Sequence, residues 1–120
     1  NYFLKNKQTP LTAIYSSAKR TEETELYVTK NLKKIERFPL SEMYAADYQL
    51  LFQLIVSNKG TNDLLLIGHN PGVSRLVEYL SGERFHARTG TMAVLEFDID
   101  QWSEISGNSG RFIEEIRYSS

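Results

Sequence analysis

The feature that most constrains the fold is a run of aliphatic residues followed at once by a tight turn and an amphipathic segment. Residues 63–67 read Asp-Leu-Leu-Leu-Ile and are flanked by turn formers. Such a run is typical of a strand buried on both faces of a parallel sheet. Residues 68–72 form the turn, and the apolar residues of 73–80 then recur at helical spacing until Gly82, a common helix stop. The pattern predicts a strand, a tight turn and a helix in succession.

The residues before this segment show the same alternation. Residues 12–16 form a short β-rich run that ends in two serines able to cap a helix. We expect a helix from Ser17 through residues 18–34, because its glutamates come early and its lysines come late, as the helix dipole favours. The apolar residues of 48–55 also recur at helical spacing, which predicts a second helix closing near Gly60.

Two β-like runs, Met92–Ile99 and Arg111–Tyr118, follow and are expected to pair antiparallel across a polar loop. Strands that alternate with helices, followed by such a pair, are typical of α/β proteins. The sequence therefore predicts a three-layer α/β/α sandwich with a mixed, mostly parallel sheet. A chain of 120 residues suits one core, so we expect a single domain over residues 1–120.

Composition narrows the classes of function. The net charge of −1 lacks the basic excess that would indicate nucleic-acid binding. The longest aliphatic run, residues 64–67, is far shorter than the roughly 20 residues that cross a bilayer, so no membrane association is expected. The chain contains no cysteine, which fits a cytoplasmic location and excludes a thiolate zinc site.

Two segments that end predicted strands carry candidate site residues. Lys19 and Arg20 fall in the first turn of the predicted helix, where a cation opposes the helix dipole. Arg20 is either a solvated surface arginine or part of an anion clamp, in which a bound phosphate accepts from the guanidinium and the helix N–H groups. His69 leaves the predicted strand at its carboxyl end, and Asn70 with Pro71 can equally be a plain helix start.

Several common sites are excluded by the same residues. The turn at 68–72 has neither the glycine spacing nor the Lys-Ser/Thr pair of a P-loop. The second histidine, His86, has no cluster of ligands at metal-binding spacing around it. We therefore expect neither a metal nor another cofactor.

Together these segments resemble the histidine phosphatase superfamily, whose members carry a Ser-Pro-x-x-Arg-x-x-x-Thr segment and later a Gly-His-Asn-Pro-Gly-like segment. Residues 16–24 match the first, with Ser17 in place of the usual proline, and residues 65–72 match the second. Further residues are similar to the small phosphohistidine phosphatases of the SixA-like branch: Leu76, Leu80, Ser81, Gly82, Thr89, Gly90, and Trp102 through Arg111. The resemblance covers the chain from Thr12 onward and implies a phosphoglycerate mutase-like fold.

The resemblance implies a phosphatase in which one histidine attacks phosphorus and the resulting phosphohistidine is hydrolysed by water. Arg20 would stabilise charge on the phosphoryl group, and His69 would hold a phosphoryl oxygen without attacking. The implied substrate-binding residues are Ser16, Asn70, Thr89 and Gly90. The implied partner is a protein that carries phosphohistidine, or a small phosphoester, and the oligomeric state is left open.

The chain departs from the superfamily at the nucleophile. In the family this histidine belongs to an Arg-His-Gly or Arg-His-Ala motif that ends the first strand, and residues 1–120 contain no such motif. His86 precedes Ala87 and Arg88, an order that does not match. Either the chain is N-terminally incomplete and lacks its first strand, or it is a noncatalytic phosphate-recognising module. The first alternative is favoured, because the family's first strand is central and its loss leaves the N–H and C=O groups of buried neighbours unpaired.

The general acid is a further open point. Some branches of the superfamily use a glutamate, and Glu42, just after Ser41, lies in a comparable region. The alternative is that Glu42 is an ordinary exposed carboxylate in a first helical turn. This alternative is favoured, because the helix dipole stabilises negative charge there. A mutase-like phosphoryl transferase is a third candidate function, which needs a substrate-enclosing region that this chain does not obviously have.

Overall fold

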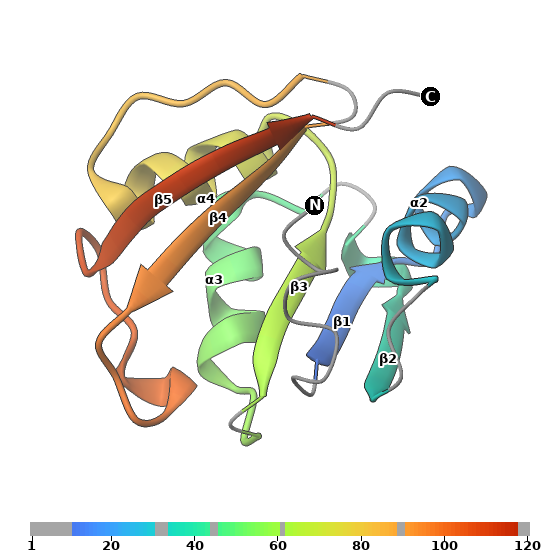
Figure 1. The fold of residues 1–120 in the computed structure, drawn as a ribbon, viewed down its shortest axis with the longest axis horizontal. Helices are drawn as coiled ribbons and strands as arrows, with labels where there is room; N and C mark the ends of the chain where they lie inside the picture. The colour runs from blue at the N-terminus through green and yellow to red at the C-terminus, as the bar shows by residue number, and fades with distance from the viewer. Residues whose placement is uncertain (1–10, 31–33, 44–45, 61, 89–90, 118–120) are drawn as a thin grey trace. The chain divides into compact units, whose positions relative to one another are not determined.

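The computed structural model describes residues 11–30, 34–43, 46–60, 62–88 and 91–117. The chain divides into two compact units. The first comprises residues 1–46 and 62–69, and the second comprises residues 47–61 and 70–120. Each unit has its own sheet, with the strand order β2-β1-β3 in the first and the pair β4-β5 in the second (Figure 1).

The first unit is built on a parallel sheet. β1 (Leu11–Ser16) lies in the middle, and β2 (Ile35–Leu40) and β3 (Asp63–Ile67) pair with it on either side. The predicted strands at residues 12–16 and 63–67, and the parallel arrangement, are confirmed. Every residue of β1 is buried, because β2 and β3 cover its two edges and α2 packs against it. The expectation of full burial for β3 is wrong, since only its Leu65 is buried.

The helix between the first two strands is shorter than predicted. α2 (Lys19–Thr29) ends five residues before Lys34, and residues 35–40 form the unpredicted strand β2. The reason is tertiary: these residues pair with buried β1, and the Leu11 N–H donates to the Lys34 carbonyl at 2.9 Å. Backbone pairing to a central strand outweighs the favourable order of charges from which the longer helix was predicted.

The second unit contains two packed helices, α3 (Tyr48–Val56) and α4 (Gly72–Ser81). The Asp47 side chain caps α3 by accepting from the Leu50 N–H at 3.0 Å. α4 ends at Gly82, whose φ of 75° is the left-handed conformation that glycine adopts at little cost, so the predicted stop is confirmed. The buried apolar residues of this pair are Leu51, Ile55, Leu76, Val77 and Leu80.

The antiparallel pair of the second unit is also confirmed. β4 (Thr91–Phe97) pairs with β5 (Gly110–Arg117), and a register shift occurs after Val94. Both strands begin one residue before the predicted starts, and Ile99 lies beyond β4. The connection contains the 3₁₀ turn η2 (Trp102–Glu104), whose Glu104 carboxylate accepts from the Gln101 N–H at 2.9 Å. The predicted strand end at Tyr118 lies outside the described residues.

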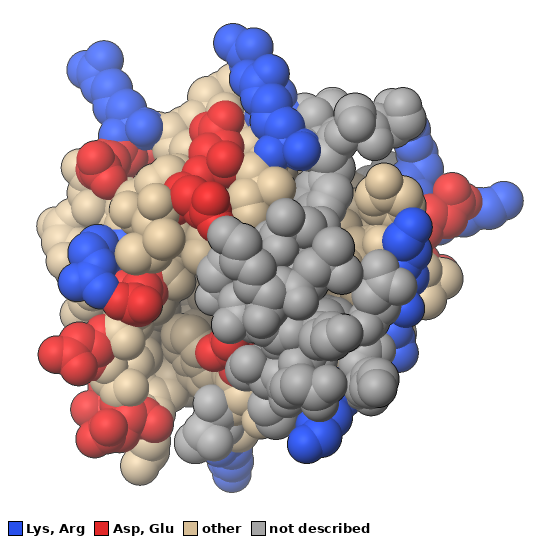
Figure 2. All heavy atoms as spheres, in the orientation of Figure 1, with Lys and Arg blue, Asp and Glu red and all other residues tan. Residues whose placement is uncertain are grey.

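Charged side chains of both signs are interspersed over the face in Figure 2, as the net charge of −1 leads one to expect. No helix within the described ranges has the length and apolar character needed to cross a membrane.

Candidate functional site

The carboxyl ends of the three parallel strands of the first unit lie at one end of its sheet. In the strand register, Ser16 is opposite Leu40 and Tyr15 is opposite Ile67. Because the strands are parallel, the segments that leave them start from this same end, where ligands bind in open α/β sheets. The segments after β1, β2 and β3 carry, in that order, Arg20, Glu42 and His69. The topology therefore brings three of the predicted site residues to one end of one sheet.

The turn between β1 and α2 is held by Ser16. This residue is fully buried, and its Oγ accepts from the Ala18 N–H at 3.3 Å. Ala18 is the N-cap residue of α2, and alanine has no side-chain oxygen with which to satisfy the first N–H groups of the helix. The predicted serine cap and helix start at Ser17 are wrong: α2 begins at Lys19, because the serine hydroxyl accepts from the N-cap residue itself.

Arg20 lies exposed in the first turn of α2, beside the exposed Lys19. Two cations near the positive end of a helix dipole are unfavourable until an anion approaches. The first N–H groups of the helix and the guanidinium are the kinds of donor that an oxyanion accepts from. Glu22, in the same turn, offsets part of the positive potential. This arrangement is compatible with an anion clamp, which stays a prediction.

His69 follows β3 and Gly68, and the residue is partly buried. Its place at the carboxyl end of a parallel strand is where an imidazole N–H can donate to a bound oxyanion. Glu42 lies exposed in the 3₁₀ turn η1 (Ser41–Met43), next to the fully buried Met43. Exposure leaves both interpretations of Glu42 open, and the meeting of Arg20 and His69 at one phosphate stays a prediction.

Asn70, in the second unit, uses both ends of its side-chain amide. Its Oδ1 accepts from the Ser74 hydroxyl at 2.7 Å, and its Nδ2 donates to the Ala87 carbonyl at 2.7 Å. The Ala87 N–H in turn donates to the Ser74 Oγ at 2.8 Å. These bonds tie the segment after α4 to the beginning of α4.

The same contacts correct the predicted start of α4. The interpretation of Asn70 as an N-cap with Pro71 as the first helical residue is wrong, since Pro71 is the N-cap and α4 begins at Gly72. The reason is that the Asn70 side-chain Oδ1, which would cap the helix, accepts from the Ser74 hydroxyl instead. Sequence reasoning missed Ser74 and Ala87, whose one signal is a serine four residues after the asparagine. Thr89 and Gly90 lie outside the described residues.

The electrostatic environment near the end of β1 changes the pKa of Tyr15. Burial raises the pKa of its phenol, the carboxylates of Glu25 and Glu22 add to the rise, and Arg37 opposes it. As for metals, no group of three or more potential ligand side chains occurs in the part of the chain that the structure describes.

Comparison with solved structures identifies the class of fold. The protein histidine phosphatase SixA, in a complex with tungstate, superposes with a TM-score of 0.76 at 23% identity, over 98% of this chain and 74% of that chain. A proposed phosphohistidine phosphatase SixA from Nakamurella multipartitia gives 0.75 at 15% identity, over 99% and 77% of the two chains. Another, from Agrobacterium tumefaciens, gives 0.67 at 21% identity, over 93% and 74%. The chain matches no protein-family model and no curated protein.

The chain is therefore an α/β protein whose candidate oxyanion-binding residues follow the carboxyl ends of parallel strands. More particularly, it has the fold of the SixA phosphohistidine phosphatases, as the resemblance in the sequence predicted. At these identities the likeness establishes the fold, and the activity is a separate question.

Proposed function

We propose that the protein is a phosphohistidine phosphatase of the SixA-like branch of the histidine phosphatase superfamily. The observation that carries the proposal is the placement of Arg20 and His69 after two parallel strands that end together, within the fold of SixA. The substrate is a protein that carries phosphohistidine, or a small phosphoester. A cytoplasmic location belongs to the same proposal.

The proposed reaction has two steps. A histidine nitrogen attacks phosphorus, forms an N–P bond and displaces the leaving group, and water then breaks that bond and releases phosphate. Arg20 stabilises the charge that builds on the phosphoryl oxygens, and His69 donates to one of them. Ser16, Asn70, Thr89 and Gly90 are proposed to shape the substrate site, and Glu42 is the candidate acid for leaving groups that need a proton.

The attacking histidine is the part of this proposal that residues 1–120 do not supply. The chain has two histidines, His69 and His86, and neither follows an arginine. Turnover is therefore proposed for the complete protein, with the nucleophile in an Arg-His motif outside these residues. This same observation favours one alternative, a noncatalytic module that recognises phosphate.

The first experiment measures the affinity of the protein for tungstate and for inorganic phosphate by calorimetry. Replacing Arg20 by alanine removes a charge-assisted hydrogen bond, which is expected to weaken binding by about 10-fold to 100-fold. Lys19→Ala is the matched control, because Lys19 is an exposed cation in the same helical turn. The proposal fails if neither anion binds, or if the two substitutions have equal effects.

The second experiment separates the phosphatase from the binding module. The complete protein is incubated with a phosphohistidine-bearing protein and with p-nitrophenyl phosphate, and released phosphate and any phosphoenzyme are measured. A phosphatase releases phosphate and slows when His69 is replaced by glutamine. Anion binding that depends on Arg20, without turnover or a phosphoenzyme, selects the binding module.

A further inference from the structure

The face of α2 that packs against the parallel sheet is polar. Its buried residues are Thr21, Glu25 and Thr29, which recur every fourth position and so share one side of the helix. The large apolar residues Leu26 and Tyr27 are instead 57% and 52% exposed. Apolar burial is therefore not what sets the rotation of α2 about its axis.

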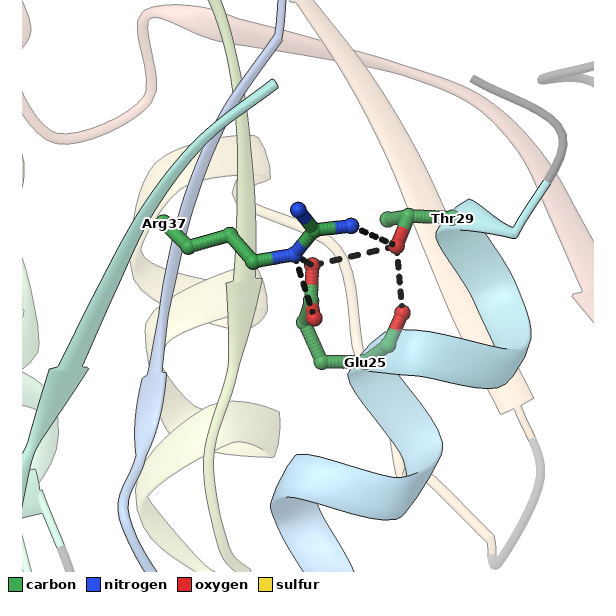
Figure 3. A network of polar contacts seen from close by, with 3 residues as sticks. All are labelled: Glu25, Thr29 and Arg37. Carbon is green, nitrogen blue, oxygen red and sulfur yellow. Dashed lines mark hydrogen bonds and ion pairs between the residues drawn. The ribbon is translucent and has the colours of Figure 1, made fainter. Parts of the chain in front are cut away.

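A polar network joins this buried face to the edge strand β2 (Figure 3). The Nε of Arg37, in β2, donates to both carboxylate oxygens of Glu25, at 3.0 and 3.1 Å. The Thr29 hydroxyl lies 2.7 Å from the Glu25 carbonyl oxygen and 3.1 Å from its Oε2, and it accepts from the Arg37 Nη2 at 3.3 Å. Both oxygens of the carboxylate therefore have a partner.

The exposure of the two ions is unequal. The Glu25 side chain is 0% exposed, whereas that of Arg37 is 40% exposed. Burying a carboxylate costs desolvation energy that its ion pair only partly returns, so such a pair adds little net stability over an apolar contact. The pair instead restricts geometry, because the Glu25 carboxylate accepts hydrogen bonds at both oxygens and tolerates little displacement. The network therefore specifies one orientation of α2.

The orientation of α2 decides where Arg20 points, because Glu25 and Arg20 belong to the same short helix. Glu25 follows Arg20 by five residues, about 7.5 Å along the axis. A rotation of about 20° moves an atom at the rim of a helix by roughly 2 Å, which is enough to break a hydrogen bond. We propose that Glu25 is a positioning residue for Arg20. By pairing with Arg37, Glu25 fixes the orientation of α2 and so aims the Arg20 guanidinium at the oxyanion. This inference rests on the oxyanion site proposed above.

The test uses Glu25→Gln, which keeps the size of the side chain and removes its charge. Tungstate affinity is expected to fall about fivefold, less than on deletion of the Arg20 guanidinium, because a misplaced group retains part of its interaction. Leu26→Ala is the matched control on the exposed side of the same helix and is expected to leave the affinity unchanged. Circular dichroism establishes that each variant is folded at the temperature of the titration.

A double-mutant cycle distinguishes positioning from general support of the fold. If Glu25 acts through Arg20, Glu25→Gln changes the tungstate affinity in the natural background and leaves it unchanged in the Arg20→Ala background. Equal fold-losses in both backgrounds overturn the inference, as does an unchanged affinity of Glu25→Gln alone. A natural chain that binds no tungstate overturns the proposed function instead, so the two failures are distinguishable.

Arg37→Lys provides a second route if Glu25→Gln does not fold. Lysine keeps the positive charge next to Glu25 but cannot reproduce the fixed planar donors of arginine. The expected result is a loss of tungstate affinity that again disappears in the Arg20→Ala background. An affinity equal to that of the natural chain contradicts the inference.

Discussion

The helices α2 and α4 are nearly equal in length but are held in opposite ways. α4 buries Leu76, Val77 and Leu80, and it ends at a left-handed glycine. α2 buries two threonines and a glutamate, exposes its leucine and tyrosine, and ends at Lys30 in ordinary right-handed conformation. One helix is fixed by apolar packing and a backbone stop, and the other by a polar network.

This difference matters because the polar helix is the one that carries Arg20. Apolar packing tolerates small shifts, since the hydrophobic effect is not directional. A network of charged hydrogen bonds fixes distances and angles at little gain in stability. The contrast indicates that α4 contributes mainly to stability and that α2 contributes mainly to the orientation of Arg20, the proposed oxyanion-binding side chain.

The largest effect is expected from the core of α4. Leu76 is 5% exposed, so Leu76→Ala should remove about 3 kcal/mol from the free energy of unfolding, through lost burial and the cavity that remains. Leu26→Ala in α2 should change it by less than about 0.5 kcal/mol, because this leucine is already exposed. Urea denaturation measures both. Similar losses in the two variants contradict the contrast between the helices.

The next effect comes from the polar network of α2. Arg37→Leu leaves the fully buried Glu25 carboxylate without its cation, and about 2 kcal/mol of stability should be lost at pH 8, less than for a pair buried on both sides. Glu25→Gln serves as the control, because the arginine left behind is partly exposed to water. A loss for Arg37→Leu no larger than that for Glu25→Gln contradicts this account.

Most of the fold was predictable because its signals are local. The aliphatic run of β3, the turn after it and the spacing of apolar residues in α4 all belong to one continuous segment. β2 was missed because Ile-Glu-Arg-Phe-Pro-Leu contains a charged pair and a proline, which suit an edge strand but do not form an alternating pattern. Its strand conformation comes from pairing with β1, which the sequence does not display.

The residues of the candidate site also differ in whether local sequence signals identify them. Arg20 and His69 were found through short motifs whose positions at strand ends follow from the alternation of elements. Glu25 was not found, because a glutamate in an acidic helix has the pattern of a solvated residue. Its proposed positioning role depends on Arg37, twelve residues away on another element. Polar partners of this kind have no sequence period, so three-dimensional pairing is needed to identify them.

The glycine that ends α4 gives a smaller effect. At Gly82 a side chain would adopt an unfavourable positive φ, and its Cβ would lie 2.4 Å from the Asn108 Oδ1, which must move. Gly82→Ala should therefore cost about 1 kcal/mol in the free energy of unfolding. Gly60→Ala is the control, because its Cβ meets only Asn58 at 3.4 Å. Thermal melts of both variants test this, and equal melting temperatures contradict a special role for the α4 stop.

The smallest effect concerns Tyr15, which lies close to the charges of the α2 network. Burial and the nearby carboxylates raise the pKa of this phenol above its ordinary value of 10.0. The contribution to stability is therefore fully present below about pH 10 and is lost as the pH rises through the higher folded value. Tyr15→Phe has no such ionisation, so its urea midpoint should decline less between pH 9 and pH 11 than that of the natural chain. Tyr27→Phe, which alters an exposed tyrosine of α2, should follow the natural chain. If Tyr15→Phe declines as steeply as Tyr27→Phe, burial and the nearby carboxylates do not raise the pKa of the Tyr15 phenol, which contradicts this prediction.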